Sequence, residues 1–196
     1  SNDRAADIFR LPRATPESQG VSSQAIVKFI RAADEKVDSM HSFMLVRHGV
    51  VIAEAWWSPE NSDKQHVLWS LSKSFTSTAV GIAVNEGKLT LDDRVIDFFP
   101  DDVPANASEN LKQMRVRDLL TMSTGHADEP NVRGSNNWVK AFLEHPVVHK
   151  PGTFFRYNTP ATFMQSAIVQ KVTGQPIDEY LQTRLFGPLG IQSPKW

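Results

Sequence analysis

The stretch VLWSLSKSFTSTAVGIAVNEGKLTLDD, residues 67–93, places Ser70 and Lys73 three residues apart where a loop leads into an amphipathic helix. Its apolar residues recur at spacings of three and four, and Gly87 follows at the position typical of a glycine that ends a helix. Side chains three residues apart at a helix start lie on the same side. The pair is therefore either a nucleophile with its base or two ordinary polar residues, with Ser70 as N-cap.

The chemistry that such a pair could perform is specific, although the pair itself is common. A serine hydroxyl becomes a good nucleophile only when a neighbouring base takes its proton. A lysine can be that base only in its neutral form, which burial or neighbouring cations favour. Serine and lysine are frequent residues, so one S-x-x-K pattern in a chain of this length is unremarkable. The rest of the sequence must distinguish the two interpretations.

The sequence around this stretch predicts a helix, a hairpin and then a long helical region. Residues 1–21 form a proline-containing leader that we expect to be irregular. A helix follows, with apolar residues every three or four positions. Residues 42–57 predict a β-hairpin, because two runs of β-branched and aromatic residues flank His48-Gly49. Residues 70–196 are mainly helical, interrupted by glycine and proline.

Composition restricts the class of protein. The chain has 196 residues, of which 40% are hydrophobic and 22% charged, with a net charge of -1 and no cysteine. A near-neutral chain without basic runs is not expected to bind nucleic acid. No apolar run approaches the roughly 18 residues of a membrane helix, so we expect no membrane span. The absence of cysteine excludes disulfides and thiolate metal sites, and the first residues lack the apolar segment of a signal peptide.

Three further blocks follow residues 67–93 in the order VRDLLTMSTGH (116–126), KPGTFFRYNTPATFMQSAIVQKVTG (150–174) and LFGPLGI (185–191). Together the blocks resemble the serine β-lactamase and penicillin-binding-protein superfamily, which uses an S-x-x-K motif. Within it the likeness is to the class C-like branch, which also holds esterases, D-aminopeptidases and DD-peptidases. The resemblance implies an α/β fold of the α+β type, with a helical subdomain and an antiparallel sheet. The hairpin alone leaves that sheet incomplete. It also implies a single domain over residues 1–196.

The resemblance assigns roles to five residues. Ser70 would be the nucleophile and Lys73 its activating partner. Class C-like members carry a Y-x-N motif facing the serine, and the match here is Tyr157-Asn158-Thr159. Tyr157 would be a second proton carrier, and Asn158 and Thr159 would bind substrate. The alternative for Tyr157 is a core tyrosine whose hydroxyl bonds to the backbone.

One departure from the family pattern bears on the substrate. Thr159 stands where the family usually has asparagine, and threonine lacks a carboxamide that both donates and accepts. This favours an esterase-like or other acyl substrate over a β-lactam or peptide. Pro160 is expected to keep Thr159 extended, in a stiff loop rather than a helix. Trp69 is expected to line the mouth of the site, with core packing as the alternative.

The third motif of the family, a K-T-G or H-x-G strand that supplies one oxyanion donor, does not occur in this sequence. The KVTG at residues 171–174 has one residue too many and ends an amphipathic helix, so Gly174 is predicted to be a C-cap. The chain therefore resembles the first portion of a longer enzyme, truncated at its C-terminus. Because one oxyanion donor contributes about 3–4 kcal/mol, we expect feeble hydrolysis unless the missing C-terminal part or a partner chain supplies the rest.

The implied function is that of a serine hydrolase acting through an acyl-enzyme on ester or amide substrates, β-lactams and D-amino-acid peptides included. Two alternatives are a non-catalytic penicillin-binding-like sensor or scaffold and one half of a split enzyme. The expected ligand is a small acyl compound, without a cofactor. No metal site is expected, because Pro146 interrupts any helix that would align His145 with His149 and no third ligand is evident. The resemblance favours a bacterial periplasmic or secreted location over a cytoplasmic one.

Overall fold

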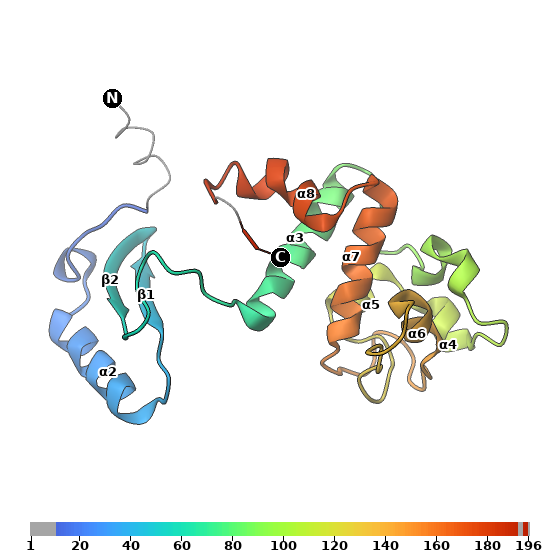
Figure 1. Cartoon of the computed structure of the whole chain (residues 1–196), viewed down its shortest axis with the longest axis horizontal. Helices are drawn as coiled ribbons and strands as arrows, with labels where there is room; N and C mark the ends of the chain where they lie inside the picture. Colours follow the sequence, from blue (N-terminus) through green and yellow to red (C-terminus); the bar gives the residue numbers. More distant parts are fainter. Residues whose placement is uncertain (1–10, 192–193, 196) are drawn as a thin grey trace. The chain divides into compact units, whose positions relative to one another are not determined.

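The computed structural model describes residues 11–191 and 194–195 of the chain (Figure 1). The chain groups into two compact units, Ser1–Val67 and Leu68–Trp196, and the single β-lactamase-like domain stays a prediction. It combines helices with a two-stranded antiparallel sheet, which confirms the predicted mixed α/β class. None of the helices in the described residues has both the length and the apolar character that crossing a membrane requires.

In its described residues the first unit contains one α-helix and the hairpin. Helix α2 spans Ser23–Lys36, strand β1 spans Ser42–Arg47 and strand β2 spans Val50–Trp56. The strands pair antiparallel within the predicted range 42–57. His48 and Gly49 at the turn have φ angles of 52° and 76°, the left-handed conformation that a two-residue hairpin turn of this hand requires. The His-Gly turn therefore sets the pairing next to it, and the register shifts between Leu45 and Val46.

The leader is more ordered than predicted where it is described, and residues 1–10 lie outside the described residues. Arg13 forms a parallel bridge with Val51 of β2, and the Val51 N–H donates to the Pro12 carbonyl at 2.8 Å. A short 3-10 turn, η1, follows at Glu17–Gln19. Proline lacks a backbone donor but keeps its acceptor, so Pro12 can still pair with a strand edge through its carbonyl.

In the described part of the second unit every regular element is a helix or a helical turn, in agreement with the prediction for residues 70–196. Helix α3 follows directly after a 3-10 turn, and helix α7 is the longest. The elements are η2 (Trp69–Leu71), α3 (Ser72–Asn85), η3 (Val95–Phe98), η4 (Pro100–Asp102), α4 (Glu109–Gln113), α5 (Val116–Leu120), α6 (Trp138–Glu144), α7 (Thr159–Thr173), α8 (Ile177–Leu181) and the π-helical turn η5 (Gln182–Phe186).

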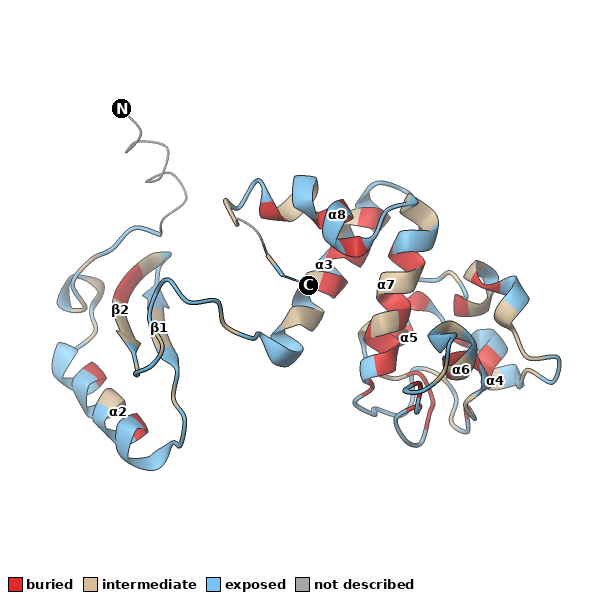
Figure 2. Cartoon of the chain, in the orientation of Figure 1, coloured by how far each residue is buried: buried red, intermediate tan, exposed pale blue. Residues whose placement is uncertain are grey.

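The core of this unit forms around α7, which packs against α3 and α5 (Figure 1). Ala79 and Ala83 of α3 are fully buried, and these small side chains let the neighbouring helix approach closely. Helix α7 contributes Met164 and Ile168, which are also fully buried. Figure 2 shows buried residues along α7 and in α3, α5 and α8. This packing fixes the two segments that carry the candidate site, namely the start of α3 and the chain just before α7.

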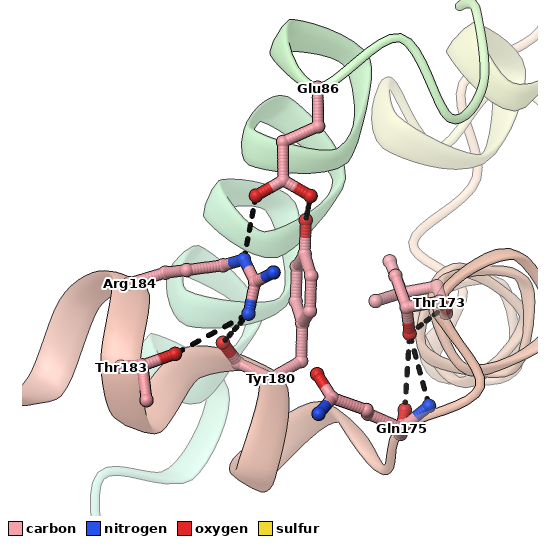
Figure 3. Close-up of polar contacts among 7 residues, drawn as sticks. Glu86, Thr173, Gln175, Tyr180, Thr183 and Arg184 are labelled. Atoms are coloured by element: carbon pink, nitrogen blue, oxygen red, sulfur yellow. Dashed lines mark hydrogen bonds and ion pairs between the residues drawn. The ribbon is translucent and has the colours of Figure 1, made fainter.

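The far end of α3 is held to α8 and η5 by a polar cluster (Figure 3). The two carboxylate oxygens of Glu86 accept hydrogen bonds from Arg184 Nε at 2.7 Å and from the Tyr180 hydroxyl at 3.0 Å. The guanidinium carbon lies 4.1 Å from the centroid of the Tyr180 ring. Burial, and then the bond to Glu86, raises the pKa of Tyr180 to about 12. The phenol therefore remains a hydrogen-bond donor at neutral pH.

The KVTG segment ends α7, as predicted. Gly174 adopts a φ of 72° as the C-cap, and its N–H donates to the Gln170 carbonyl at 2.9 Å. The Thr173 hydroxyl accepts a hydrogen bond from the Gln175 N–H at 3.2 Å (Figure 3). The resemblance of this segment to a K-T-G strand is therefore accidental.

Candidate active site

Ser70 and Lys73 lie side by side at the beginning of α3. Ser70 is the central residue of η2, and Lys73 belongs to the first turn of α3. Lys73 Nζ donates to Ser70 Oγ at 3.0 Å. The N-cap position of α3 is occupied by Leu71, without a capping side chain, so the alternative in which Ser70 merely caps the helix does not hold. The serine hydroxyl is exposed.

Tyr157 reaches the same hydroxyl from the segment before α7. Its OH lies 2.5 Å from Ser70 Oγ, although the two residues are 87 positions apart. The Tyr157 side chain is partly exposed, at 46% for the residue, so the alternative of a core tyrosine is wrong. Two side chains able to carry a proton thus contact one serine oxygen.

The electrostatics of the site favour the ionised phenol. Interaction with the Lys73 side chain, and next with the Ser70 hydroxyl, lowers the pKa of Tyr157 below its usual value. The negative charge of Glu129 acts in the opposite direction. A lower pKa increases the share of phenolate at neutral pH, and a phenolate can accept a proton. Tyr157 and Tyr180, the only tyrosines of the chain, therefore shift in opposite directions.

Asn158 lies beneath the exposed face of the site, and the substrate-binding role predicted for it stays a prediction. The residue is fully buried and is the N-cap of α7, where Oδ1 accepts from the Ala161 N–H at 2.9 Å. Its amide nitrogen lies 3.3 Å from Thr124 Oγ1 and 3.4 Å from His126 Nδ1. Both ends of the carboxamide are thus occupied by protein partners. Asn158 holds the segment that carries Tyr157 against the unit.

Thr159 is exposed and is the first residue of α7, so the prediction of a loop at this position is wrong. Pro160 falls in the first turn of the helix, where a backbone N–H has no intrahelical acceptor. The N–H that proline lacks therefore costs no hydrogen bond there. The residue held extended is Asn158, with φ -147° and ψ 96°. Thr159 donates its backbone N–H to Glu129 Oε1 at 2.6 Å. The side chain of Thr159 stays available at the surface of the site segment.

Trp69 precedes the serine and is 83% exposed, so core packing, the alternative considered for this residue, is wrong. Its φ angle of 47° lies in the left-handed region, which is uncommon for a bulky residue and costs about 1–3 kcal/mol. The Trp69 carbonyl accepts a hydrogen bond from Ser72 Oγ at 2.7 Å. The indole is free to contact a ligand next to Ser70, and its role at the mouth of the site stays a prediction.

The sequence analysis missed the polar residues that support the site from the loop after α5. Thr124 Oγ1 lies 2.9 Å from His126 Nδ1, and both residues are buried. Burial, and then the neighbouring His145, lowers the pKa of His126 to about 4. Glu129 lies in the same loop. The segment STGHADE at residues 123–129 is the only signal that could have identified them, because it concentrates polar residues after an apolar helix.

The described residues contain no group of three histidine, cysteine or acidic side chains that could hold a metal ion. His145 instead pairs with Asp128, with Nε2 3.0 Å from Oδ1. The pair formed by His145 and Asp128 lies next to the buried His126 and not at Ser70.

Comparison with known proteins places the chain in a family. The family model described as Beta-lactamase matches residues 29–196. The chain belongs to the β-lactamase family. This confirms the resemblance deduced from the S-x-x-K and Y-x-N blocks.

One relative in sequence is the Escherichia coli K12 protein named “Putative D-alanyl-D-alanine carboxypeptidase”. It is 25% identical over 219 aligned residues, which cover 95% of this chain and 50% of that protein. The Salmonella typhimurium protein of the same name is 22% identical and is likewise covered to 50%. This β-lactamase-family chain thus spans about half the length of the curated relatives it matches.

Solved structures of the family show the same fold. The β-lactamase/D-alanine carboxypeptidase of Pseudomonas syringae is 24% identical with a TM-score of 0.69, covering 86% of this chain and 49% of that one. The penicillin-binding protein homologue of Pyrococcus abyssi is 23% identical with a TM-score of 0.68, covering 88% and 44%. These likenesses confirm the predicted β-lactamase-like fold.

Proposed function

We propose that this member of the β-lactamase family is a serine hydrolase that forms a covalent acyl-enzyme on Ser70. The observation that carries the proposal is the convergence of the Lys73 amine and the Tyr157 phenol on one exposed hydroxyl. A serine oxygen within reach of two proton-carrying groups has the arrangement that nucleophilic catalysis requires.

The reaction would proceed in two halves. Ser70 Oγ attacks the acyl carbonyl while its proton passes to the Tyr157 phenolate, which the Lys73 side chain stabilises, or to Lys73 itself once that amine has lost its proton. As the tetrahedral intermediate collapses, the phenol donates a proton to the leaving alcohol or amine, and the acyl group stays on Ser70. Water then attacks the acyl-enzyme, one of the two groups accepts its proton, and the Ser70 hydroxyl is restored as the carboxylic acid departs.

The nature of the residues around the serine supports an acyl ester as substrate. Thr159 stands at the position of the Y-x-N asparagine and Asn158 is fully buried, so no carboxamide from this motif lies on the exposed face. Thr159 and Trp69 are the exposed side chains next to the proton carriers. We therefore propose small esters as better substrates than β-lactams. D-alanyl peptides also belong in the test, because the named relatives are D-alanyl-D-alanine carboxypeptidases.

The test is a comparison of substrates with the full-length protein. Purified wild type and Ser70→Ala would be assayed with p-nitrophenyl esters, nitrocefin and a D-alanyl-D-alanine peptide, and intact mass would be recorded after a fluorophosphonate. We expect ester hydrolysis and one phosphonate adduct in the wild type, both absent from Ser70→Ala. A long-lived adduct without turnover of any substrate would instead support the sensor function. Equal turnover by Ser70→Ala would overturn the proposal.

A further inference from the structure

Glu129 brings a negative charge to the edge of the site. Its Oε1 accepts the Thr159 N–H at 2.6 Å, and Thr159 follows Tyr157 by two residues. Glu129 itself is exposed, so its second oxygen is not enclosed by protein. The carboxylate therefore lies beside the segment whose phenol touches Ser70.

The backbone geometry directs the relevant side chains to one face. Asn158 is extended, with φ -147° and ψ 96°, and successive side chains on an extended chain point to opposite sides. Asn158 points into the unit and is fully buried, whereas Tyr157 and Thr159 are exposed. Tyr157 and Thr159 thus expose their side chains on either side of the buried Asn158, and Glu129 binds the backbone of this segment at Thr159.

The charge of Glu129 reaches the reacting groups. Glu129 binds the backbone of Thr159, two positions after Tyr157, and its negative charge acts against ionisation of that phenol. The neighbouring acid, Asp128, has other partners: it lies 3.0 Å from His145 Nε2, and both His145 and Arg156 lower its pKa. Glu129 makes no salt bridge among the described residues. Its charge is therefore not balanced by an ion pair at the edge of the site, while the Lys73 amine lies at Ser70 itself.

We propose that Glu129 is a specificity-determining residue that makes the site select acyl substrates carrying a positively charged group over those carrying a negatively charged one. The inference rests on the proposed hydrolase function and adds a chemical class of substrate to it. A cationic group on the acyl chain would approach the carboxylate while its carbonyl lies at Ser70. An anionic group at the same position would be repelled.

The experiment uses three p-nitrophenyl esters that share one acyl chain length and end in a trimethylammonium, a methyl or a sulfonate group. For the full-length protein, kcat/KM of each charged ester is divided by that of the neutral ester, which removes general effects on activity. At separations of about 7–10 Å, partly screened by solvent, one charge changes each ratio about threefold. We expect the cation-to-anion ratio to exceed one in the wild type and to fall about tenfold in Glu129→Gln.

Two variants and one condition separate an electrostatic role from a structural one. Glu129→Asp keeps the charge and is expected to retain the preference for the cation. Asp128→Asn removes the same charge from the adjacent residue and is expected to leave the ratio close to the wild-type value. Raising NaCl to about 1 M shortens the Debye length to about 3 Å, so the preference of the wild type should shrink. If Glu129 acted only by capping α7, the substrate preference would not depend on salt in this way.

The outcomes also distinguish this inference from the function on which it rests. If Ser70-dependent turnover is present but Glu129→Gln leaves the cation-to-anion ratio unchanged, the specificity role is overturned and the hydrolase function stands. An equal change in Asp128→Asn would also overturn it, because overall charge would then be the cause. Absence of Ser70-dependent turnover or acylation with every ester would overturn both.

Discussion

Lys73 Nζ lies 5.1 Å from the centroid of the Tyr157 ring, so the amine and the phenol flank a single serine oxygen. Lys73 comes from the first turn of α3, and Tyr157 comes from the segment before α7. The packing of these two helices is what brings the groups together. The predictions that follow separate the chemical roles of the site from the interactions that hold it in place.

Removal of the Lys73 amine should impair chemistry without unfolding the protein. We expect Lys73→Met to lower kcat/KM for esters by about 10²–10⁴, the usual contribution of a positioned acid or base. Lys73→Arg should not restore the rate, because a guanidinium stays protonated and cannot accept the serine proton. Stopped assays and circular dichroism on both variants test this. Wild-type rates in Lys73→Arg would show that Lys73 acts only as a fixed charge.

The two tyrosines should ionise at well-separated pH values. Lys73 and Ser70 lower the pKa of Tyr157, so its phenolate forms below the usual value near 10, whereas Tyr180 ionises at about 12. An alkaline absorbance titration of the wild type minus Tyr157→Phe isolates the first transition, and subtraction of Tyr180→Phe isolates the second. Lys73→Met should move the first transition to higher pH. A Tyr157 transition that is unaffected by Lys73→Met would contradict the proposed contact.

Asn158 and Thr159 should differ sharply in their effect on stability. Asn158→Ala removes the N-cap of α7 and leaves buried partners unpaired, so we expect a loss of about 2–4 kcal/mol in the free energy of unfolding. Thr159→Ala alters an exposed side chain and keeps the backbone bond to Glu129, and should cost about 0.5 kcal/mol or less. Urea denaturation of both variants measures the difference. Equal losses would refute the structural role of Asn158.

The buried His126 should make the protein sensitive to mild acid. Its pKa falls from 6.5 to about 4 in the folded protein, so protonation favours the unfolded chain. The stability linked to this residue is complete above pH 6.5 and is lost as the pH falls from about 6.5 to about 4. The loss amounts to about 3 kcal/mol.

Thermal and urea unfolding between neutral pH and pH 4 test this on the wild type and on His126→Leu. The variant should be less stable at neutral pH but should lack this part of the pH dependence. His48→Asn, a change at an exposed histidine in the hairpin turn, is the matched control and should keep the wild-type slope. An identical slope in His126→Leu would show that other groups cause the acid sensitivity.

Much of the fold could be predicted because its signals are local. The His48-Gly49 turn, the end of α7 at Gly174 and the position of Ser70 before a helix each follow from neighbouring residues and backbone preferences. Local signals do not predict that Tyr157 contacts Ser70, because the two residues are 87 positions apart. This placement was predicted from the order of the sequence blocks and not from spacing. These positions agree with the structure, while the catalytic roles stay predictions.

The rest depended on partners distant in sequence. The carboxamide of Asn158 can bind a substrate or cap a helix, and only the positions of Thr124 and His126 determine which. Pro160 restricts the residue before it and also suits a first helical turn, so local rules conflicted at Thr159. The Glu129 contact with Thr159 spans 30 residues and has no periodic signal. The boundary between the two units, after Val67, is likewise not marked by a change in composition.

The alternation of exposed and buried side chains before α7 also indicates which positions can be substituted to change the substrate. A library that varies position 159 together with position 129 would explore new acyl groups while leaving the helix cap intact. Position 158 would tolerate exchange only if the threonine and histidine beneath it were changed in the same clone. The two-residue period of an extended backbone thus separates, at adjacent positions, side chains that face solvent from the one that holds the segment in place.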